Sequence, residues 1–175
     1  MSRIYLVRHG EAAAGWGDDI DPGLSDTGRA QADAMAASLA GRGPLPIVVS
    51  PLRRTRETAA ALERTWGTTA RVDPAVGEIP SPTDDLNERM AWLASVLPTP
   101  MRTWSADLQS WRGTIADALL AIEEDTVVVT HFVAIRSVLD DDGFQPDYCS
   151  VTVVDNAGGS LALVELGAQR ATVIR

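Results

Sequence analysis

Short apolar runs alternate with longer amphipathic stretches along this chain, and this alternation limits the possible folds more than any other feature. Three runs rich in β-branched residues predict buried strands, at residues 4–7, 47–49 and 126–130. Ser25 predicts the start of one helix, and Ser50 before Pro51 predicts the N-cap of another. Strands and helices that alternate in this way form βαβ units. We therefore expect an α/β fold, a three-layer α/β/α sandwich with a mostly parallel central sheet.

The remainder of the chain continues this pattern without any sign of a linker between domains. Prolines and glycines in residues 73–82 predict a loop, and helical patterns begin near Leu86 and Trp104. Two apolar runs, 151–155 and 161–166, predict a β-hairpin. A chain of 175 residues with 45% hydrophobic content is long enough to bury one sizeable core. We expect a single domain over residues 1–175.

Charge and residue usage exclude several classes of function. The formal net charge is −9, which disfavours general binding to nucleic acid or to anionic membranes. All 15 basic residues are Arg, so a Schiff-base lysine, a pyridoxal-phosphate lysine and a P-loop lysine are excluded. Any anionic substrate must therefore be attracted by arginines gathered at one place.

The sequence also indicates where the protein resides. Cys149 is the single cysteine, so neither an intrachain disulfide nor a multi-thiolate metal site can form. The apolar run that follows Arg3 is too short for a secretory signal or a membrane span. We expect a cytoplasmic protein that binds no membrane.

The two histidines, His9 and His131, each follow the end of a predicted buried strand. Ligands of open α/β sheets bind at the carboxyl edge of the strands, so this placement favours a functional role over a structural one. Arginines in residues 50–56 would lie in the first turn of a helix, where backbone N–H groups already favour anions. A charged helix face paired with nearby carboxylates is the alternative interpretation, and we prefer it for Arg53 and Arg56.

Four segments, in order, resemble the histidine phosphatase superfamily, which includes the cofactor-dependent phosphoglycerate mutases. Residues 6–11 (LVRHGE) are similar to its RHG signature, and residues 21–28 (DPGLSDTG) to its D-x-x-L-[ST]-x-x-G stretch. Residues 50–55 (SPLRRT) resemble its S-x-L-x-R-[AT] motif, and residues 127–136 its late strand and histidine. The matches span residues 4–136 and include both histidines. The resemblance implies a phosphoglycerate mutase-like fold.

The resemblance also implies a covalent mechanism. His9 would attack phosphorus and form a phosphohistidine that water then cleaves. Arg8, Arg54 and His131 would stabilise the charge on the transferred phosphoryl group, with no metal and no cofactor. Arg54 is preferred to Arg53 because it precedes Thr55, as the family's Arg precedes Ala or Thr.

A general acid is needed to protonate the leaving group. By resemblance, the acid lies in a loop that Glu78 matches best, and Asp84, Asp85 and Glu11 are competing candidates. The alternative interpretation of Glu78 is an exposed loop residue.

The predicted function is a metal-independent phosphatase that acts on a phosphorylated small molecule or a phosphopeptide, cleaving a phosphomonoester or a phosphoramidate. A phosphoglycerate mutase-type phosphoryl transferase is one alternative. Relatives that isomerise often carry longer insertions than the stretch between Gly67 and Trp104, so we expect hydrolysis. A catalytically silent phosphate- or phosphopeptide-binding domain is the other alternative. A metallohydrolase is disfavoured because the two histidines lack a metal-ligand spacing.

Overall fold

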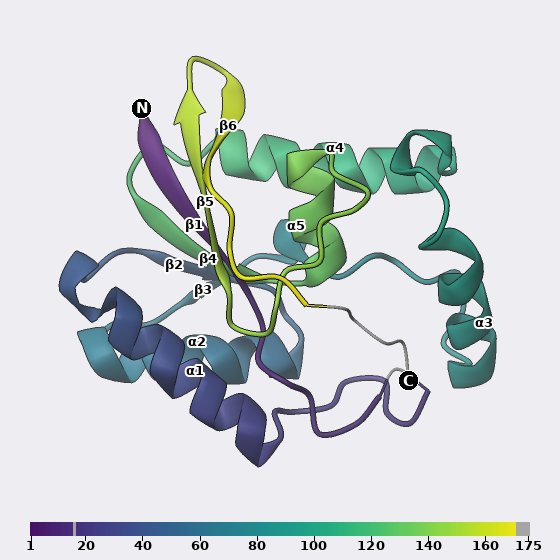
Figure 1. The fold of residues 1–175 in the computed structure, drawn as a ribbon, viewed down its shortest axis with the longest axis horizontal. Coiled ribbons are helices and arrows are strands. Elements are labelled where there is room, and N and C mark those ends of the chain that lie inside the picture. Colours follow the sequence, from purple (N-terminus) through teal and green to yellow (C-terminus); the bar gives the residue numbers. More distant parts are fainter. Residues whose placement is uncertain (16, 171–175) are drawn as a thin grey trace.

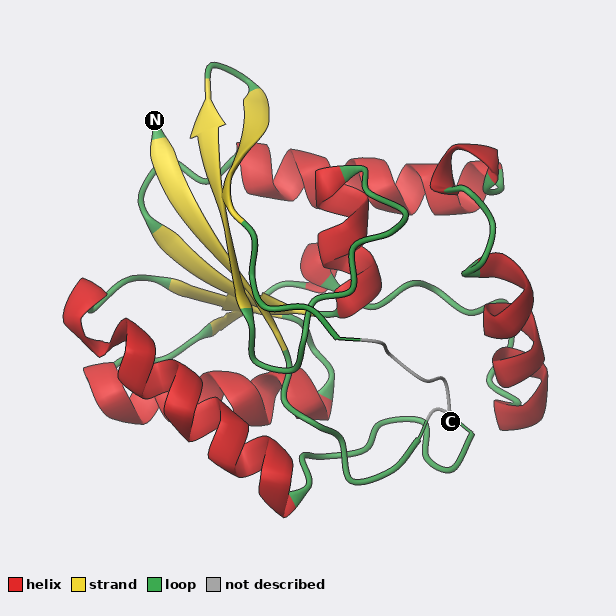
Figure 2. Cartoon of the chain, in the orientation of Figure 1, coloured by secondary structure: helices red, strands yellow, loops and turns green. Residues whose placement is uncertain are grey.

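The computed structural model describes residues 1–15 and 17–170, and its centre is a six-stranded sheet (Figures 1 and 2). In chain order the strands are β1 (Ser2–Arg8), β2 (Ile47–Val49), β3 (Arg71–Val72), β4 (Thr126–Thr130), β5 (Val151–Ala157) and β6 (Ser160–Glu165). Their order across the sheet is β3-β2-β4-β1-β5-β6. The first four strands of that order are mutually parallel. Strand β5 pairs antiparallel with β1, and β6 pairs antiparallel with β5. The mostly parallel sheet is confirmed.

Helices cover both faces of the sheet, which confirms the three-layer arrangement. The helices are α1 (Asp26–Leu39), α2 (Arg53–Trp66), α3 (Leu86–Val96), α4 (Ala106–Leu120) and α5 (Phe132–Leu139). Figure 1 shows α1 and α2 on one face and α4 and α5 on the other, with α3 set apart beyond them. No helix in the described part of the chain is long and apolar enough to cross a membrane.

The side chains of β1 point alternately to the two faces of the sheet, which explains why two separate cores form. Tyr5 and Val7 belong to the cluster that packs against α1 and α2. Ile4 and Leu6 belong to the cluster that packs against α4 and α5. Successive side chains of a strand point to opposite faces, so one fully apolar strand is buried on both sides. A third cluster joins α3 to the start of α5 and lies outside these two layers.

The start of α1 follows the sequence prediction closely. The Ser25 hydroxyl accepts a hydrogen bond from the Gly28 amide at 3.0 Å, as an N-cap does. A Cβ on Gly28 would lie 2.1 Å from the carbonyl oxygen of Glu11, in the loop that follows β1. Glycine at this position therefore allows the helix and that loop to make backbone contact.

The predicted N-cap of α2 is wrong. The helix begins at Arg53, its N-cap is Leu52, and no side chain caps it. The Ser50 hydroxyl lies 2.8 Å from Nε2 of His131 instead. The hydroxyl is directed to the buried imidazole and not to the amides of the helix, so a tertiary contact overrides the local signal. The helix ends at Gly67, which adopts φ 65°, as the sequence predicts.

Local structure also forms where no strand or helix was predicted. A short edge strand, β3, precedes the proline-rich segment, and residues 74–76 form one turn of 3₁₀ helix. Strand β3 has two exposed residues and gave no apolar signal. The C-terminal hairpin is confirmed, with β5 and β6 joined through Gly158 and Gly159, both at positive φ.

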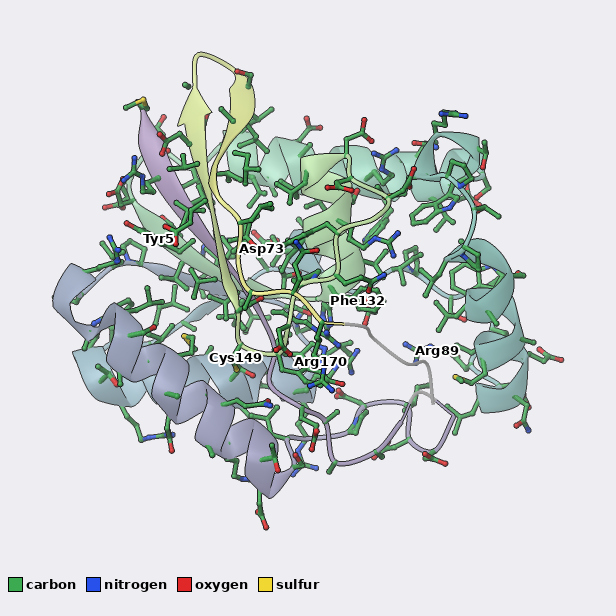
Figure 3. All side chains as sticks on the ribbon, viewed as in Figure 1. Tyr5, Asp73, Arg89, Phe132, Cys149 and Arg170 are labelled. Atoms are coloured by element: carbon green, nitrogen blue, oxygen red, sulfur yellow. The ribbon has the colours of Figure 1, made fainter. Side chains whose placement is uncertain are left out.

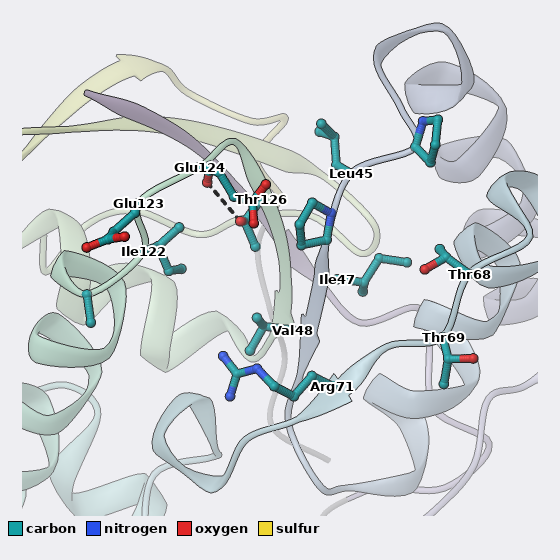
Figure 4. Close-up of a pocket in the computed structure, with 13 residues that line it drawn as sticks. Leu45, Ile47, Val48, Thr68, Thr69, Arg71, Ile122, Glu123, Glu124 and Thr126 are labelled. Carbon is teal, nitrogen blue, oxygen red and sulfur yellow. Dashed lines mark hydrogen bonds between the residues drawn. The ribbon is translucent and has the colours of Figure 1, made fainter.

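A groove of about 580 Å³ lies at the amino-terminal edge of the parallel strands (Figure 4). It is lined by residues 44–48, 68, 69 and 71 from one side and by residues 121–124 and 126 from the other. None of the five predicted site residues, all within the described part of the chain, lines this groove. Ligands of such sheets bind at the opposite edge, so the groove is not the expected active site.

Candidate active site

The structure brings the five predicted site residues together at the carboxyl edge of the parallel strands. Arg8 ends β1 and His9 follows it, Arg54 lies in the first turn of α2, Glu78 follows β3, and His131 follows β4. Arg8, His9, Arg54 and His131 are buried, and the side chain of Glu78 is 6% exposed. The His9 and His131 rings lie 5.3 Å apart in an edge-on arrangement. Residues distant in the sequence meet because parallel strands deliver their carboxyl ends to one edge.

Backbone hydrogen bonds between neighbouring strands hold the loops that carry these side chains. The His9 amide donates to the carbonyl of Thr130 at 3.0 Å, and the Ser50 amide donates to the carbonyl of Val129 at 3.1 Å. The Thr130 hydroxyl donates to the carbonyl of Val76 at 2.6 Å, which fixes the turn before Glu78. The site is thus anchored to the sheet from three directions.

The His9 ring is held as a neutral imidazole with Nε2 directed into the site. Its Nδ1 lies 2.7 Å from the carbonyl oxygen of Gly10, and a carbonyl can only accept a hydrogen bond. Nδ1 therefore carries the proton and Nε2 keeps its lone pair, which accepts from Nε of Arg54 at 3.3 Å. Burial, together with nearby Arg54 and His131, lowers the pKa of His9 well below its ordinary value of 6.5. A neutral imidazole with a free lone pair has the chemistry that a nucleophile needs at neutral pH.

His131 is fixed through both ring nitrogens. Its Nδ1 lies 3.2 Å from Oε2 of Glu78, and its Nε2 lies 2.8 Å from the Ser50 hydroxyl. A carboxylate accepts, so Nδ1 carries the proton. Burial lowers the pKa of His131, although the Glu78 carboxylate opposes that effect. The neutral ring then accepts from the Ser50 hydroxyl. The sequence showed Ser50 as part of a motif and as a cap, and its contact with His131 was missed.

Glu78 is an anion between two cationic or polar donors. Its Oε2 accepts from Nη2 of Arg54 at 2.9 Å and also lies against His131. Burial by itself raises the pKa of Glu78, but His131 and Arg54 outweigh burial and place the pKa well below its usual range. In the free site Glu78 is therefore a carboxylate, and the expectation of an exposed loop residue does not hold.

Arg8 is held in place by a backbone carbonyl and two aromatic rings. Its Nη1 donates to the carbonyl of Pro146 at 2.8 Å, and the guanidinium carbon lies 4.0 Å from the ring centroid of Tyr148. Phe132 lies on the guanidinium at 5.2 Å. Burial lowers the pKa of Arg8, yet arginine stays protonated in proteins. Tyr148 was not predicted, and no sequence signal distinguishes it from an ordinary loop tyrosine.

The competing acids lie elsewhere. Glu11 accepts from the Ser25 hydroxyl at 2.8 Å, beside the start of α1. Asp85 caps α3 by accepting from the amides of Asn87 and Glu88. Asp84 is exposed. Of the four candidates, Glu78 is the one in contact with His131.

The assembled groups fit a tetrahedral oxyanion. The Arg54 guanidinium contacts Nε2 of His9, the His131 ring lies 5.3 Å from the His9 ring, and Arg8 is close enough to act on His9 electrostatically. Such groups can neutralise the charge of an oxyanion. Within residues 1–15 and 17–170, no group of three or more His, Cys, Asp or Glu side chains could hold a metal ion.

The fold and the cluster suit an oxyanion ligand, and comparison with known proteins assigns the family. The model of the histidine phosphatase superfamily (branch 1) matches residues 4–169. The chain therefore belongs to that superfamily.

The curated relatives are longer than this chain. A glucosyl-3-phosphoglycerate phosphatase of Mycolicibacterium vanbaalenii is 41% identical over 82 residues, which are 45% of this chain and 36% of that protein. The enzyme of the same name from Mycobacterium tuberculosis is 40% identical over 80 residues, 43% of this chain and 36% of the relative. The match thus spans 36% of the length of these relatives.

Solved structures share the whole fold. A phosphoserine phosphatase from Entamoeba histolytica, in complex with 3-phosphoglyceric acid, superposes with a TM-score of 0.70 at 22% identity. That match covers 97% of this chain and 98% of the other. The native mycobacterial glucosyl-3-phosphoglycerate phosphatase gives a TM-score of 0.69 at 25% identity, covering 96% and 99% of the two chains. These likenesses confirm the phosphoglycerate mutase-like α/β fold.

Proposed function

We propose that this protein is a phosphatase that hydrolyses a phosphomonoester or a phosphoramidate through a phosphohistidine on His9. The observation that carries the proposal is the neutral His9 ring, with its free lone pair on Nε2 beside Arg54. A nucleophile that is buried among cations and unprotonated suits attack on an anionic phosphorus centre. The names of the relatives as phosphatases support the same class of reaction.

In the first step, Nε2 of His9 forms a bond to phosphorus while the bond from phosphorus to the leaving oxygen or nitrogen breaks. Arg8, Arg54 and His131 hold the non-bridging oxygens, whose charge is spread in the transition state. The arginines supply the positive charge that a metal ion supplies in other phosphoryl-transfer sites. The step therefore needs neither a metal nor a cofactor.

Glu78 protonates the leaving group once the substrate is bound. In the free site its carboxylate accepts from Arg54 and from His131. The phosphoryl oxygens compete for these same donors, and their negative charge raises the pKa of a nearby carboxylate. Substrate binding thus converts Glu78 from a counter-ion into an acid.

In the second step, water attacks phosphorus and the bond to Nε2 of His9 breaks. The Glu78 carboxylate, left deprotonated by the first step, accepts a proton from that water. Inorganic phosphate leaves, and His9 returns to its neutral form with the proton still on Nδ1. The reacting partner that we propose is a phosphorylated small molecule or a phosphopeptide.

The test uses p-nitrophenyl phosphate with and without a chelator. We expect release of p-nitrophenol that a chelator does not reduce, and a phosphoenzyme that is stable in base and labile in acid after rapid quenching. His9→Ala should abolish both signals, whereas Arg64→Met, at an exposed position on α2, should keep both. Phosphate binding without turnover over a wide pH range would instead favour the silent binding domain. Turnover that depends on a bisphosphorylated primer would favour a mutase.

A further inference from the structure

The two peptide groups on either side of Gly10 are both held by side chains from helices. The Gly10 amide donates to the Thr58 hydroxyl of α2 at 3.0 Å. The Glu11 amide donates to Oε1 of Gln31, on α1, at 2.8 Å. The carbonyl of this second peptide group belongs to Gly10, and it lies 2.7 Å from Nδ1 of His9. One peptide group therefore contacts Gln31 through its N–H and the His9 ring through its C=O.

Gln31 reaches this peptide group because the loop after β1 packs on the start of α1. Figure 3 shows the chain that leaves β1 passing the first turn of that helix. A Cβ on Gly10 would lie 2.6 Å from the carbonyl oxygen of Gly28, and a Cβ on Gly28 would lie 2.1 Å from that of Glu11. Gln31 is three residues beyond Gly28, so the two share a face of the helix. Backbone contact between loop and helix thus brings the Gln31 side chain beside the Gly10–Glu11 peptide.

The orientation of this peptide group decides which nitrogen of His9 carries the proton. In a neutral imidazole, the hydrogen bond at one ring nitrogen sets the protonation of the other. A carbonyl at Nδ1 keeps the proton there and leaves the lone pair on Nε2, which attack on phosphorus requires. Rotation of the peptide group by half a turn would present the Glu11 N–H to Nδ1 instead, and the proton would move to Nε2. Glycine at position 10 resists such a rotation less than other residues do.

The other contact of the His9 ring cannot replace this control. Nε of Arg54 lies 3.3 Å from Nε2, which is long for a hydrogen bond. In the proposed mechanism Arg54 holds phosphoryl oxygens, so that contact is weakened when a substrate is bound. The hydrogen bond at Nδ1 then has to keep the lone pair on Nε2.

We propose that Gln31 is a positioning residue for the nucleophile: its side-chain oxygen fixes the Gly10–Glu11 peptide, which keeps the proton of His9 on Nδ1. This inference rests on the proposed function, because it concerns the nucleophile of that reaction. An amide N–H bonds only to an acceptor, so glutamate at position 31 should replace glutamine, and methionine, of similar length, should not. The alternative role for Gln31 is a tether between loop and helix that does not affect the ring.

Nitrogen-15 NMR of the imidazole rings measures the position of the proton directly. The chain has two histidines, so two ring patterns are expected, and the pattern missing in His9→Ala is that of His9. At neutral pH the wild-type protein and Gln31→Glu should show His9 protonated on Nδ1. Gln31→Met should show part or all of the His9 signal in the form protonated on Nε2. Gln109→Met is the matched control, because Gln109 is also a half-buried helix glutamine and bonds the carbonyl of Met101 at 2.6 Å.

Rate and binding measurements separate positioning from a merely structural role. Gln31→Met should slow the release of p-nitrophenol from p-nitrophenyl phosphate about 3- to 10-fold, the equivalent of one hydrogen bond. Inorganic phosphate, measured by calorimetry, should bind to Gln31→Met as tightly as to the wild type or more tightly, because an N–H on Nε2 can donate to a phosphate oxygen. Gln31→Glu and Gln109→Met should stay within about threefold of the wild type in both assays.

Four results would overturn the proposal. The first two are an unchanged His9 ring pattern or an unchanged rate in Gln31→Met. The third is weaker phosphate binding in that variant, which would indicate general damage to the site. The fourth is an effect in Gln31→Glu or Gln109→Met equal to that in Gln31→Met.

The two proposals can fail separately, because the ring pattern is measured without a substrate. If the wild-type protein does not hydrolyse p-nitrophenyl phosphate, the phosphatase proposal fails, while the NMR comparison still decides whether Gln31 controls the His9 ring. If hydrolysis occurs and the ring pattern of Gln31→Met is that of the wild type, the phosphatase proposal stands and Gln31 only tethers the loop to α1.

Discussion

Replacing Glu78 with Gln separates its two proposed roles, as the acid for the leaving group and as the counter-ion of the free site. Glutamine keeps the shape of the side chain but cannot donate an acidic proton. A positioned general acid contributes about 10²- to 10⁴-fold to a rate, so alkyl phosphates should lose about that much in kcat. The phenolate of an aryl phosphate leaves without protonation, so kcat for aryl phosphates should fall by less than about tenfold.

The same change should strengthen the binding of inorganic phosphate. Oε2 of Glu78 lies 2.9 Å from Nη2 of Arg54 and 3.2 Å from Nδ1 of His131, the groups that phosphate needs. Two unit negative charges about 4 Å apart repel by about 4 kcal/mol at an effective dielectric constant of 20. The wild-type protein avoids most of this repulsion by protonating Glu78, so a gain of about tenfold in affinity is expected for Glu78→Gln.

Two assays test this reasoning. The dependence of kcat on the pKa of the leaving group should steepen in Glu78→Gln, and calorimetry should show tighter phosphate binding. Glu11→Gln is the matched control, because Glu11 contacts Ser25 rather than the cluster. Equal losses on alkyl and aryl phosphates would show that Glu78 is not the acid. Weaker phosphate binding would show that Glu78 does not compete with phosphate for Arg54 and His131.

Three further predictions concern the supports of the site. Ser50→Ala removes the 2.8 Å contact to Nε2 of His131 and should lower kcat/KM about tenfold in steady-state assays. The helix content measured by circular dichroism should not change, and a loss of helix would mean that Ser50 caps α2 after all. Gly28→Ala should destabilise by about 2 kcal/mol or more in urea unfolding, because its Cβ would meet a backbone oxygen at 2.1 Å. Gly113→Ala, whose Cβ meets nothing within 4 Å in α4, should stabilise by about 0.5–1 kcal/mol, and similar losses at both glycines would contradict the contact argument. The pKa values of His9 and His131 are lowered, so below pH 6.5 the unfolded chain binds protons that the native chain does not. Stability should therefore fall as the pH drops through 6.5, and His9→Ala should make this fall shallower; an unchanged slope would show that His9 is protonated in the native protein.

The sequence predicts the fold well where pattern and burial agree. Strands 47–49 and 126–130 were predicted with the observed ends, because they are fully buried apolar runs with polar neighbours. Ser25 was predicted as a cap because no other group competes for its role at the helix start. The His9 and His131 positions follow from the rule that ligands gather at the carboxyl edge of parallel strands.

The features that the sequence did not predict depend on contacts between distant parts of the chain. Ser50 has the local signature of a helix cap, yet His131, 81 residues away, takes its hydroxyl. Strand β3 contributes two exposed residues to the sheet edge and so has no apolar pattern to recognise. Each miss concerns a polar side chain or edge segment whose partners come from elsewhere in the chain.

Electrostatics connects the stability of the free site to its proposed chemistry. Arg54 is 1% exposed and His131 is 0% exposed, so an empty site without an anion would leave a guanidinium buried and uncompensated. Glu78 supplies that anion in the free protein, which explains why a carboxylate tolerates so much burial. In the proposed mechanism a bound phosphoryl group supplies the charge in its place, and the carboxylate then gains the proton that a leaving group requires. Under this proposal, the exchange of one anion for another compensates the cations in both states, and the acid forms only when a substrate is present.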